Sequence, residues 1–217
     1  MLDEPGVLVV GSEVPNMLEP GAASTLVVSE DVDIGVPVAS HAAVKRRLGE
    51  VRALAPSREE PSVWVPLVEG LLEANFVGID PSLHDAAESY VLEDAELPLL
   101  VFGTLGFMRP GRTVEVDGIR IPLPRASDLL LEKLLTDRSG IKTDRDLLVA
   151  LGLLLVGGEE DLGELALTYR ELSAESRRAV CSNLALLSLI GPVPGMPDPS
   201  AHRARAVGLL RRLERVP

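Results

Sequence analysis

The chain contains 217 residues, and its 46% hydrophobic and 25% charged residues exclude an intrinsically disordered protein. A formal net charge of −12 disfavours a general electrostatic attraction to nucleic acid or to an anionic membrane. The single cysteine, Cys181, excludes an intramolecular disulfide, and three scattered histidines disfavour a zinc site. Any bound metal is therefore expected to be held by carboxylates, which favours Mg²⁺, Mn²⁺ or Ca²⁺.

Membrane contact is not expected from the sequence. The first residues lack the basic region of a signal peptide, and the longest apolar run, residues 147–156, is shorter than a membrane span. We therefore expect a soluble, cytoplasmic protein in which residues 147–156 form a buried helix.

The first part of the chain predicts a small sheet with helices around it. The expected strands lie at residues 7–10, 25–28, 31–36 and 97–102, and the expected helices lie at residues 13–18, 40–54 and 62–74. Residues 113–123 alternate between apolar and polar side chains around Asp117-Gly118, which predicts a β-hairpin. Residues 83–91 are ambiguous between the two patterns.

The rest of the chain predicts helices throughout. They are expected at residues 129–135, 147–156, 161–172, 174–189 and 201–216, with a proline-rich linker at 191–199. We therefore expect an α+β fold with two domains. Residues 1–124 would form a small mixed sheet flanked by helices, and residues 125–217 would form a C-terminal helical bundle.

Two short polar motifs lie on or directly after expected strands. Gly11-Ser12 follows the strand at 7–10, where such a turn offers backbone N–H groups and a hydroxyl to a triphosphate. Asp31 and Asp33 point to the same face of their strand, roughly 6.5–7 Å apart at Cα, so both carboxylates can converge on one divalent cation. Together the motifs fit metal-dependent nucleotidyl transfer, although Asp31 and Asp33 would also suit the solvent-facing side of an edge strand.

This ordered set resembles the nucleotidyltransferase superfamily with the polymerase-beta-like fold. The resemblance is carried by residues 7–12 and 29–36, and by a downstream segment of leucines, acids and bases at residues 119–147. It covers about residues 5–160 and is similar to a bacterial branch that includes abortive-infection-type toxins. It implies a nucleotidyltransferase-type mixed sheet and a helical bundle that closes one side of a nucleotide cleft.

The resemblance also implies which residues form the site. Asp31 and Asp33 would be catalytic and would hold Mg²⁺ or Mn²⁺. The nucleotide would be bound by Gly11, Ser12, Lys133, Arg138 and Lys142. The reaction would transfer NMP from an NTP to an acceptor hydroxyl on a tRNA, a protein or a small molecule.

A third acidic residue is expected on a later central strand in this superfamily. The strand at 97–102 is the candidate, but it contains no acid, so Glu96 at its edge and Glu115 on the hairpin become the candidates, with Glu96 preferred. This gap, and the negative charge of Glu13 beside the phosphate turn, favour a second hypothesis. In it the chain is a catalytically lapsed nucleotidyltransferase fold that binds a nucleotide or a partner protein, in a toxin–antitoxin-like or regulatory role.

Other interpretations remain open at this point. A plain helical scaffold would leave Asp31 and Asp33 far from Gly11. Lys133 would either extend its ammonium group to water from a leucine-rich helix or reach a phosphate. The basic last helix, residues 201–216, is expected to contact the acidic remainder of the protein rather than a polynucleotide.

Overall fold

The computed structural model of the chain describes residues 1–19, 31–83, 85–136, 143–192 and 198–215. The chain divides into two compact units. Within the described residues, the first unit comprises residues 1–11 and 31–124, and the second comprises residues 12–19 and 125–215. One division between the units falls after Pro124, and residues 12–19 group with the helical unit instead of the sheet.

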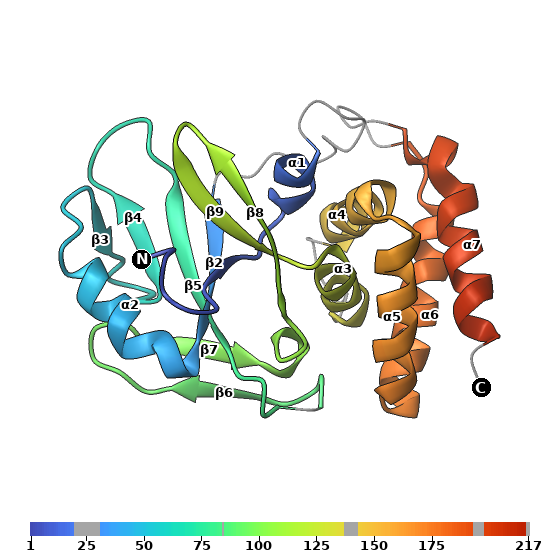
Figure 1. Cartoon of the computed structure of the whole chain (residues 1–217), viewed down its shortest axis with the longest axis horizontal. Helices are drawn as coiled ribbons and strands as arrows, with labels where there is room; N and C mark the ends of the chain where they lie inside the picture. Colours follow the sequence, from blue (N-terminus) through green and yellow to red (C-terminus); the bar gives the residue numbers. More distant parts are fainter. Residues whose placement is uncertain (20–30, 84, 137–142, 193–197, 216–217) are drawn as a thin grey trace. The chain divides into compact units, whose positions relative to one another are not determined.

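The first unit is organised around a mixed sheet, and Figure 1 labels its strands from β2 to β7. Its described strands are β1 (Leu8–Val9), β2 (Asp31–Pro37), β3 (Leu54–Pro56), β4 (Val63–Pro66), β5 (Glu73–Ile79), β6 (Ser89–Leu92) and β7 (Leu99–Phe102). Strand β2 pairs antiparallel with β1 and parallel with β5. The other edge of β5 pairs antiparallel with β4 and, further along, parallel with β7. Strand β3 pairs antiparallel with β4, and β6 pairs antiparallel with β7.

One face of this sheet packs against helix α2 (His41–Leu48), which follows a short 3₁₀ turn at Val38–Ser40. The ring of Trp64 meets that of Phe76 edge-on at 6.5 Å in this core. The buried residues of the core are Val7, Ile34, Val36, Val44, Leu48, Trp64, Ala74, Phe76, Leu97 and Leu99. Because alternate strand residues point to opposite faces, burial of these residues turns Asp31, Asp33 and Asn75 to the other face.

A two-stranded hairpin completes the first unit. Strands β8 (Pro110–Val116) and β9 (Ile119–Pro124) pair antiparallel, after a 3₁₀ turn at Gly103–Leu105. Their turn places Asp117 at φ 49° and Gly118 at φ 77°, the left-handed conformation that a tight hairpin turn requires at both positions. The hairpin predicted at residues 113–123 is therefore confirmed.

The regular elements of the second unit are all helices among its described residues. Its helices are α1 (Val14–Leu18), α3 (Ala126–Leu135), α4 (Thr143–Val156), α5 (Glu159–Glu171), α6 (Ala174–Leu189) and α7 (Arg203–Glu214), the last preceded by a 3₁₀ turn at Pro199–His202. From Leu147 to Val156, helix α4 is apolar on all sides, and the residues from Leu147 to Leu151 are almost completely buried. The predicted buried helix at residues 147–156 is thus confirmed.

The structure confirms the α+β class, with a mixed sheet and a run of helices, but it corrects two predicted helices. The helix predicted at residues 62–74 is wrong, because this segment contains β4 and leads into β5. Val63, Trp64 and Val65 favour an extended chain, and Pro66 cannot occupy the interior of a helix without losing a hydrogen bond. The predicted helix at 40–54 ends early, at Leu48, and the strand predicted at 25–28 lies outside the described residues.

No helix in the described part of the chain is long and apolar enough to cross a membrane.

Candidate functional site

The candidate site lies at the start of β2, on the face of the sheet opposite α2. Asp31 and Asp33 share this face, as predicted from their spacing, and both are only partly buried. The neighbouring parallel strand β5 aligns Glu73 with Asp31 and Asn75 with Asp33. The site is thus built from two adjacent strands whose polar side chains emerge from the same end of the sheet.

Asn75 connects the two aspartates directly. Its Nδ2 atom donates a hydrogen bond to Asp31 Oδ2 over 2.9 Å and a second to Asp33 Oδ1 over 3.2 Å. The Oδ1 atom of the same amide is buried and has no hydrogen-bond partner. A buried carbonyl oxygen without a partner is energetically costly. The amide therefore donates hydrogen bonds to both carboxylates while its own oxygen accepts none.

Gly11 closes the site from the side of β1. The backbone N–H of Val10 donates to Asp33 O over 3.0 Å, which brings the end of β1 against β2. A Cβ atom built on Gly11 would lie 2.7 Å from Asp33 Oδ2, closer than real side chains approach. Any side chain at position 11 would therefore displace the Asp33 carboxylate, and the structure brings Gly11 and Asp33 side by side.

These residues fit a divalent cation held by oxygen atoms. Mg²⁺ prefers carboxylate ligands supplemented by amide or water oxygens, and Asp31, Asp33 and Asn75 supply this donor set. The unpaired Asn75 Oδ1 is a second indication of a cation site. Rotation of the amide would place this oxygen where its Nδ2 group now contacts the two carboxylates. The amide N–H group thus occupies the place that a positive charge would take.

A third carboxylate does not complete the site among the described residues. No three of their acidic, histidine or cysteine side chains come together with a spacing that would hold a metal ion. Glu73 is the nearest acid by register, since it pairs with Asp31, yet it forms no such group with Asp31 and Asp33. On the side away from β1, the neighbour of β2 is β5 and not the segment at 97–102. Asn75 of β5 therefore lies opposite Asp33, where a third acid from that segment was expected.

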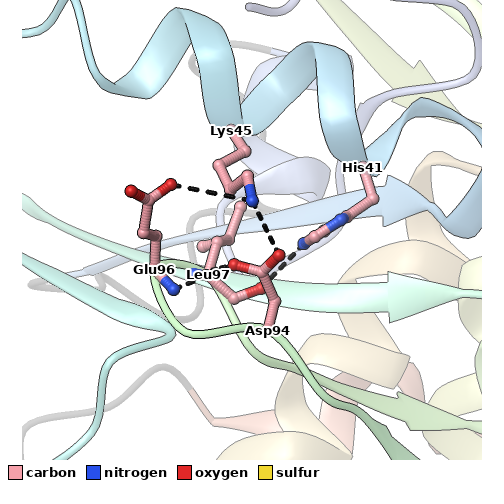
Figure 2. Close-up of polar contacts among 5 residues, drawn as sticks. All are labelled: His41, Lys45, Asp94, Glu96 and Leu97. Atoms are coloured by element: carbon pink, nitrogen blue, oxygen red, sulfur yellow. Dashed lines mark hydrogen bonds and ion pairs between the residues drawn. The ribbon is translucent and has the colours of Figure 1, made fainter.

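Glu96 lies in a different environment (Figure 2). Its Oε2 atom is 3.6 Å from Lys45 Nζ, and its side chain is 74% exposed. Lys45 belongs to α2, which packs on the sheet face opposite the two aspartates. The structure therefore does not bring Glu96, preferred as the third catalytic acid, to Asp31 and Asp33. The other candidate, Glu115, lies opposite Arg120 on the hairpin and is exposed.

Lys45 connects helix α2 to the loop before β7. Lys45 Nζ lies 2.7 Å from Asp94 Oδ2, and the hydrogen bond holds the pKa of the Asp94 carboxyl well below its usual range and raises the pKa of Lys45. Asp94 also accepts from the backbone N–H groups of Glu96 and Leu97. A ring nitrogen of His41, Nε2, lies 2.8 Å from Leu97 O (Figure 2). This network anchors the loop before β7 to the helix and has a structural role.

An apolar row adjoins the two aspartates on the same sheet face. Val77 follows Asn75 by two residues, Leu100 of β7 aligns with Val77, and Val91 of β6 aligns with Leu100. Leu100 and Val91 are 41% and 49% exposed, although they lie within the sheet. The polar end of this face therefore continues into an uncovered apolar surface.

The remaining expected nucleotide ligands are placed as follows. Lys133, on α3 of the second unit, lies 3.0 Å from Glu132 Oε2 and its side chain is 16% exposed, so its ammonium group does not extend freely to water. Ser12 and Glu13 begin the part of the chain that belongs to this unit, and Glu13 accepts a hydrogen bond from Asn16 in α1. Arg138 and Lys142 lie outside the described residues.

The residue that sequence reasoning missed is Asn75. Its signal was present in the alternation Glu73, Asn75, Val77 against Ala74, Phe76, Gly78, which is the pattern of a strand with one polar end. The helix expected at 62–74 concealed the start of this strand, so that Asn75 was not considered as a neighbour of Asp31 and Asp33.

Comparison with known proteins adds one distant likeness. No family model matches the chain, and no curated protein matches its sequence. The crystal structure of an antigenic nucleotidyltransferase-like protein from Paracoccidioides brasiliensis is similar to this chain with a TM-score of 0.45 and 15% identity, over 94% of this chain and 84% of that one. At this similarity the likeness by itself assigns neither a family nor an activity.

Proposed function

We propose that this protein binds an NTP with Mg²⁺ at Asp31 and Asp33 and transfers its NMP group to an acceptor hydroxyl. The observation that supports this most directly is the meeting of three elements at one end of the sheet. Asp31 and Asp33 project from β2, Asn75 contacts both from β5, and Gly11 leaves room beside Asp33. The order of these motifs along the chain also resembles the nucleotidyltransferase superfamily.

In this reaction the acceptor oxygen forms a bond to the α-phosphorus of the NTP. The bond between this phosphorus and the bridging oxygen to the β-phosphorus breaks, pyrophosphate leaves, and the acceptor hydroxyl loses its proton. Bound Mg²⁺ would supply positive charge to the phosphate oxygens. The task of Asp31, Asp33 and Asn75 is to fix the cation, and the task of Gly11 is to let the phosphates approach the strand end.

Nucleotide-dependent thermal stability tests the proposed site. Each of the four NTPs is added with and without Mg²⁺ to the wild type and to the Asp31→Asn/Asp33→Asn variant. A ligand at 100 times its dissociation constant stabilises the folded state by about 2.7 kcal/mol, which is readily measured. We expect a Mg²⁺-dependent rise in Tm with at least one NTP in the wild type and none in the variant.

The matched control is Glu59→Gln/Glu60→Gln, which also removes two negative charges, but from exposed positions in the loop before β4. It should respond to Mg²⁺ and NTP as the wild type does. Gly11→Ala is a second variant, because the added methyl group would crowd Asp33 without changing any charge. The absence of any nucleotide-dependent shift in the wild type, with every NTP and with Mn²⁺ as well, would overturn the proposal.

A second candidate function is favoured by Asn75 itself. An amide where a third carboxylate would complete a metal site suits a lapsed enzyme that retains nucleotide binding, or a protein-interaction module in a toxin–antitoxin-like or regulatory pair. Pyrophosphate release from α-labelled NTP, with RNA, protein and small-molecule acceptors, separates the two. An active enzyme releases pyrophosphate as it stands, whereas a lapsed one binds NTP without turnover.

The Asn75→Asp variant sharpens this distinction. It adds a carboxylate within hydrogen-bond distance of Asp31 and Asp33, so it should strengthen Mg²⁺ binding because the ion then meets three negative charges. Turnover in Asn75→Asp but not in the wild type would favour the lapsed enzyme. Turnover in the wild type would favour the active enzyme. Asn75→Ala serves as the control that removes the amide without adding charge.

A further inference from the structure

A basic groove lies within the second unit, between α5 and α7. It encloses about 560 Å³ and takes four residues from each helix. They are Gly163, Ala166, Leu167 and Arg170 on α5, and Gly208, Arg211, Arg212 and Arg215 on α7 or directly after it. On both helices the spacing is i, i+3, i+4 and i+7, so each helix contributes one continuous stripe. The volume falls in the range of small-molecule sites.

The floor of the groove is open because two of its residues, Gly163 and Gly208, have no side chain. Gly163 and Gly208 lie inside helices, where glycine is less stable than alanine by about 1 kcal/mol. A Cβ atom on Gly208 would meet no atom within 4 Å, and one on Gly163 would meet only Arg212 Nη2 at 3.8 Å. Packing of the two helices therefore does not require either glycine. What their small size provides is space above the helix backbone.

Arg205, which lies outside the groove, and Arg212, which lines it, both have partners among the described residues, unlike the other arginines of the groove. Arg205 donates to Leu155 O over 2.9 Å and to Gly157 O over 3.4 Å, which satisfies carbonyl groups at the end of α4. Arg212 Nη1 donates to Glu159 Oε2 over 2.9 Å, the contact with acidic surface that was expected of this basic helix. Within the described part of the chain, Arg170, Arg211 and Arg215 form no ion pair, and all three are exposed.

We propose that the groove between α5 and α7 binds a phosphorylated ligand through these arginines. The guanidinium group offers planar, bidentate hydrogen bonds that match phosphate oxygens. Three such groups without an ion pair to any described residue, together with the paired Arg212, line an open floor in a chain with a net charge of −12. Leu167, 60% exposed, and the glycine floor give a flat surface for the uncharged part of a nucleotide. The phosphate groups can come from a free nucleotide or from a nucleic-acid strand.

Binding at this groove is separable from the proposed metal site, because it needs no divalent cation. The test therefore uses the full chain in EDTA, with a labelled single-stranded RNA oligonucleotide of mixed sequence and with tripolyphosphate as competitor. Arg211→Gln/Arg215→Gln should weaken binding about tenfold or more, since each charge-assisted hydrogen bond to phosphate contributes at this scale. Rising salt should weaken wild-type binding steeply.

The matched control is Arg46→Gln/Arg178→Gln, which removes two exposed positive charges from α2 and α6. Gly208→Leu is a second test that keeps every charge. It fills the floor with a better helix-forming residue, so it should raise Tm while it weakens binding. Asp31→Asn/Asp33→Asn should bind the probes as the wild type does.

The two probes also identify the source of the phosphate. Competition by millimolar tripolyphosphate supports recognition of the phosphate group itself, as in a free nucleotide. Binding of the oligonucleotide without such competition supports a nucleic-acid strand. The proposal is overturned when neither probe binds in EDTA, or when the Arg46→Gln/Arg178→Gln control loses as much affinity as Arg211→Gln/Arg215→Gln.

Discussion

Strands β2 and β5 present opposite chemistry on their two faces. Towards α2 they direct Ile34, Val36 and Phe76, which are at most 4% exposed and belong to the hydrophobic core. Towards the other face they direct Asp33 and Asn75, which are partly exposed and hydrogen-bonded to each other. Successive residues of the same strand thus serve stability and chemistry in turn.

This alternation means that the candidate site is held by backbone geometry rather than by its own side chains. The parallel pairing of β2 with β5 fixes Asp33 opposite Asn75, and the core on the opposite face fixes the pairing. Replacing a polar residue of the site should therefore leave the fold intact, whereas replacing its neighbour in sequence should not.

The largest effect is expected for Phe76→Ala. Phe76 is 1% exposed and its ring contacts Trp64, so truncation removes buried surface and leaves a cavity. We expect the free energy of unfolding to fall by about 3–5 kcal/mol in urea denaturation. Val77→Ala, one residue further and on the opposite face, should cost only about 1 kcal/mol. Equal losses in the two variants would contradict the separation of the faces.

A smaller effect is expected for Asn75→Ala. It removes two hydrogen bonds to carboxylates, so the free energy of unfolding should fall by about 1–3 kcal/mol without Mg²⁺. In the Asp31→Asn/Asp33→Asn background the same substitution should cost less, which gives a coupling energy of about 1 kcal/mol in a double-mutant cycle. Zero coupling would show that Asn75 and the two aspartates do not interact in solution.

The helical unit was the easier part to predict from the sequence. Helix α6 begins and ends at the predicted residues 174–189, because its apolar positions recur with the helical period and Ser173 caps its first turn. The groove between α5 and α7 was not predicted, since it depends on which helices lie side by side. Helical periodicity gives the face of each helix but not its neighbour.

The sheet was harder to predict for the same physical reason. Strand β2 and the Asp117-Gly118 turn have strong local signals, and both were found. Strand β5 has a weaker one, because Leu71 and Leu72 lead into Glu73 and extend a pattern that suits a helix equally well. The partner of β2 is a non-local property of the chain. Asp31 and Asp33 could therefore be identified from sequence, whereas Asn75 required the structure.

The smallest expected effect concerns the network on the α2 side and depends on pH. Lys45 lowers the pKa of the Asp94 carboxyl, whose ordinary value is 3.8, and the pKa of Lys45 is itself raised above 10.5. A lowered carboxyl pKa stabilises the folded state above pH 3.8, and this contribution is lost as the pH falls further. A raised lysine pKa stabilises it below pH 10.5, and this contribution is lost as the pH rises further.

Lys45→Met should therefore lower Tm most between pH 3.8 and pH 10.5, and progressively less as the pH moves outside this range. Arg46→Met removes the neighbouring charge, which is exposed on the same helix, and is the matched control. Because the ion pair is close to water, added salt should reduce the difference in Tm between Lys45→Met and the wild type.

The nucleotide-dependent shift in Tm should remain unchanged in Lys45→Met, since Lys45 with Asp94 and the two aspartates of the candidate site lie on opposite faces of the sheet. A lost nucleotide response would show instead that Glu96 and its neighbours belong to the site.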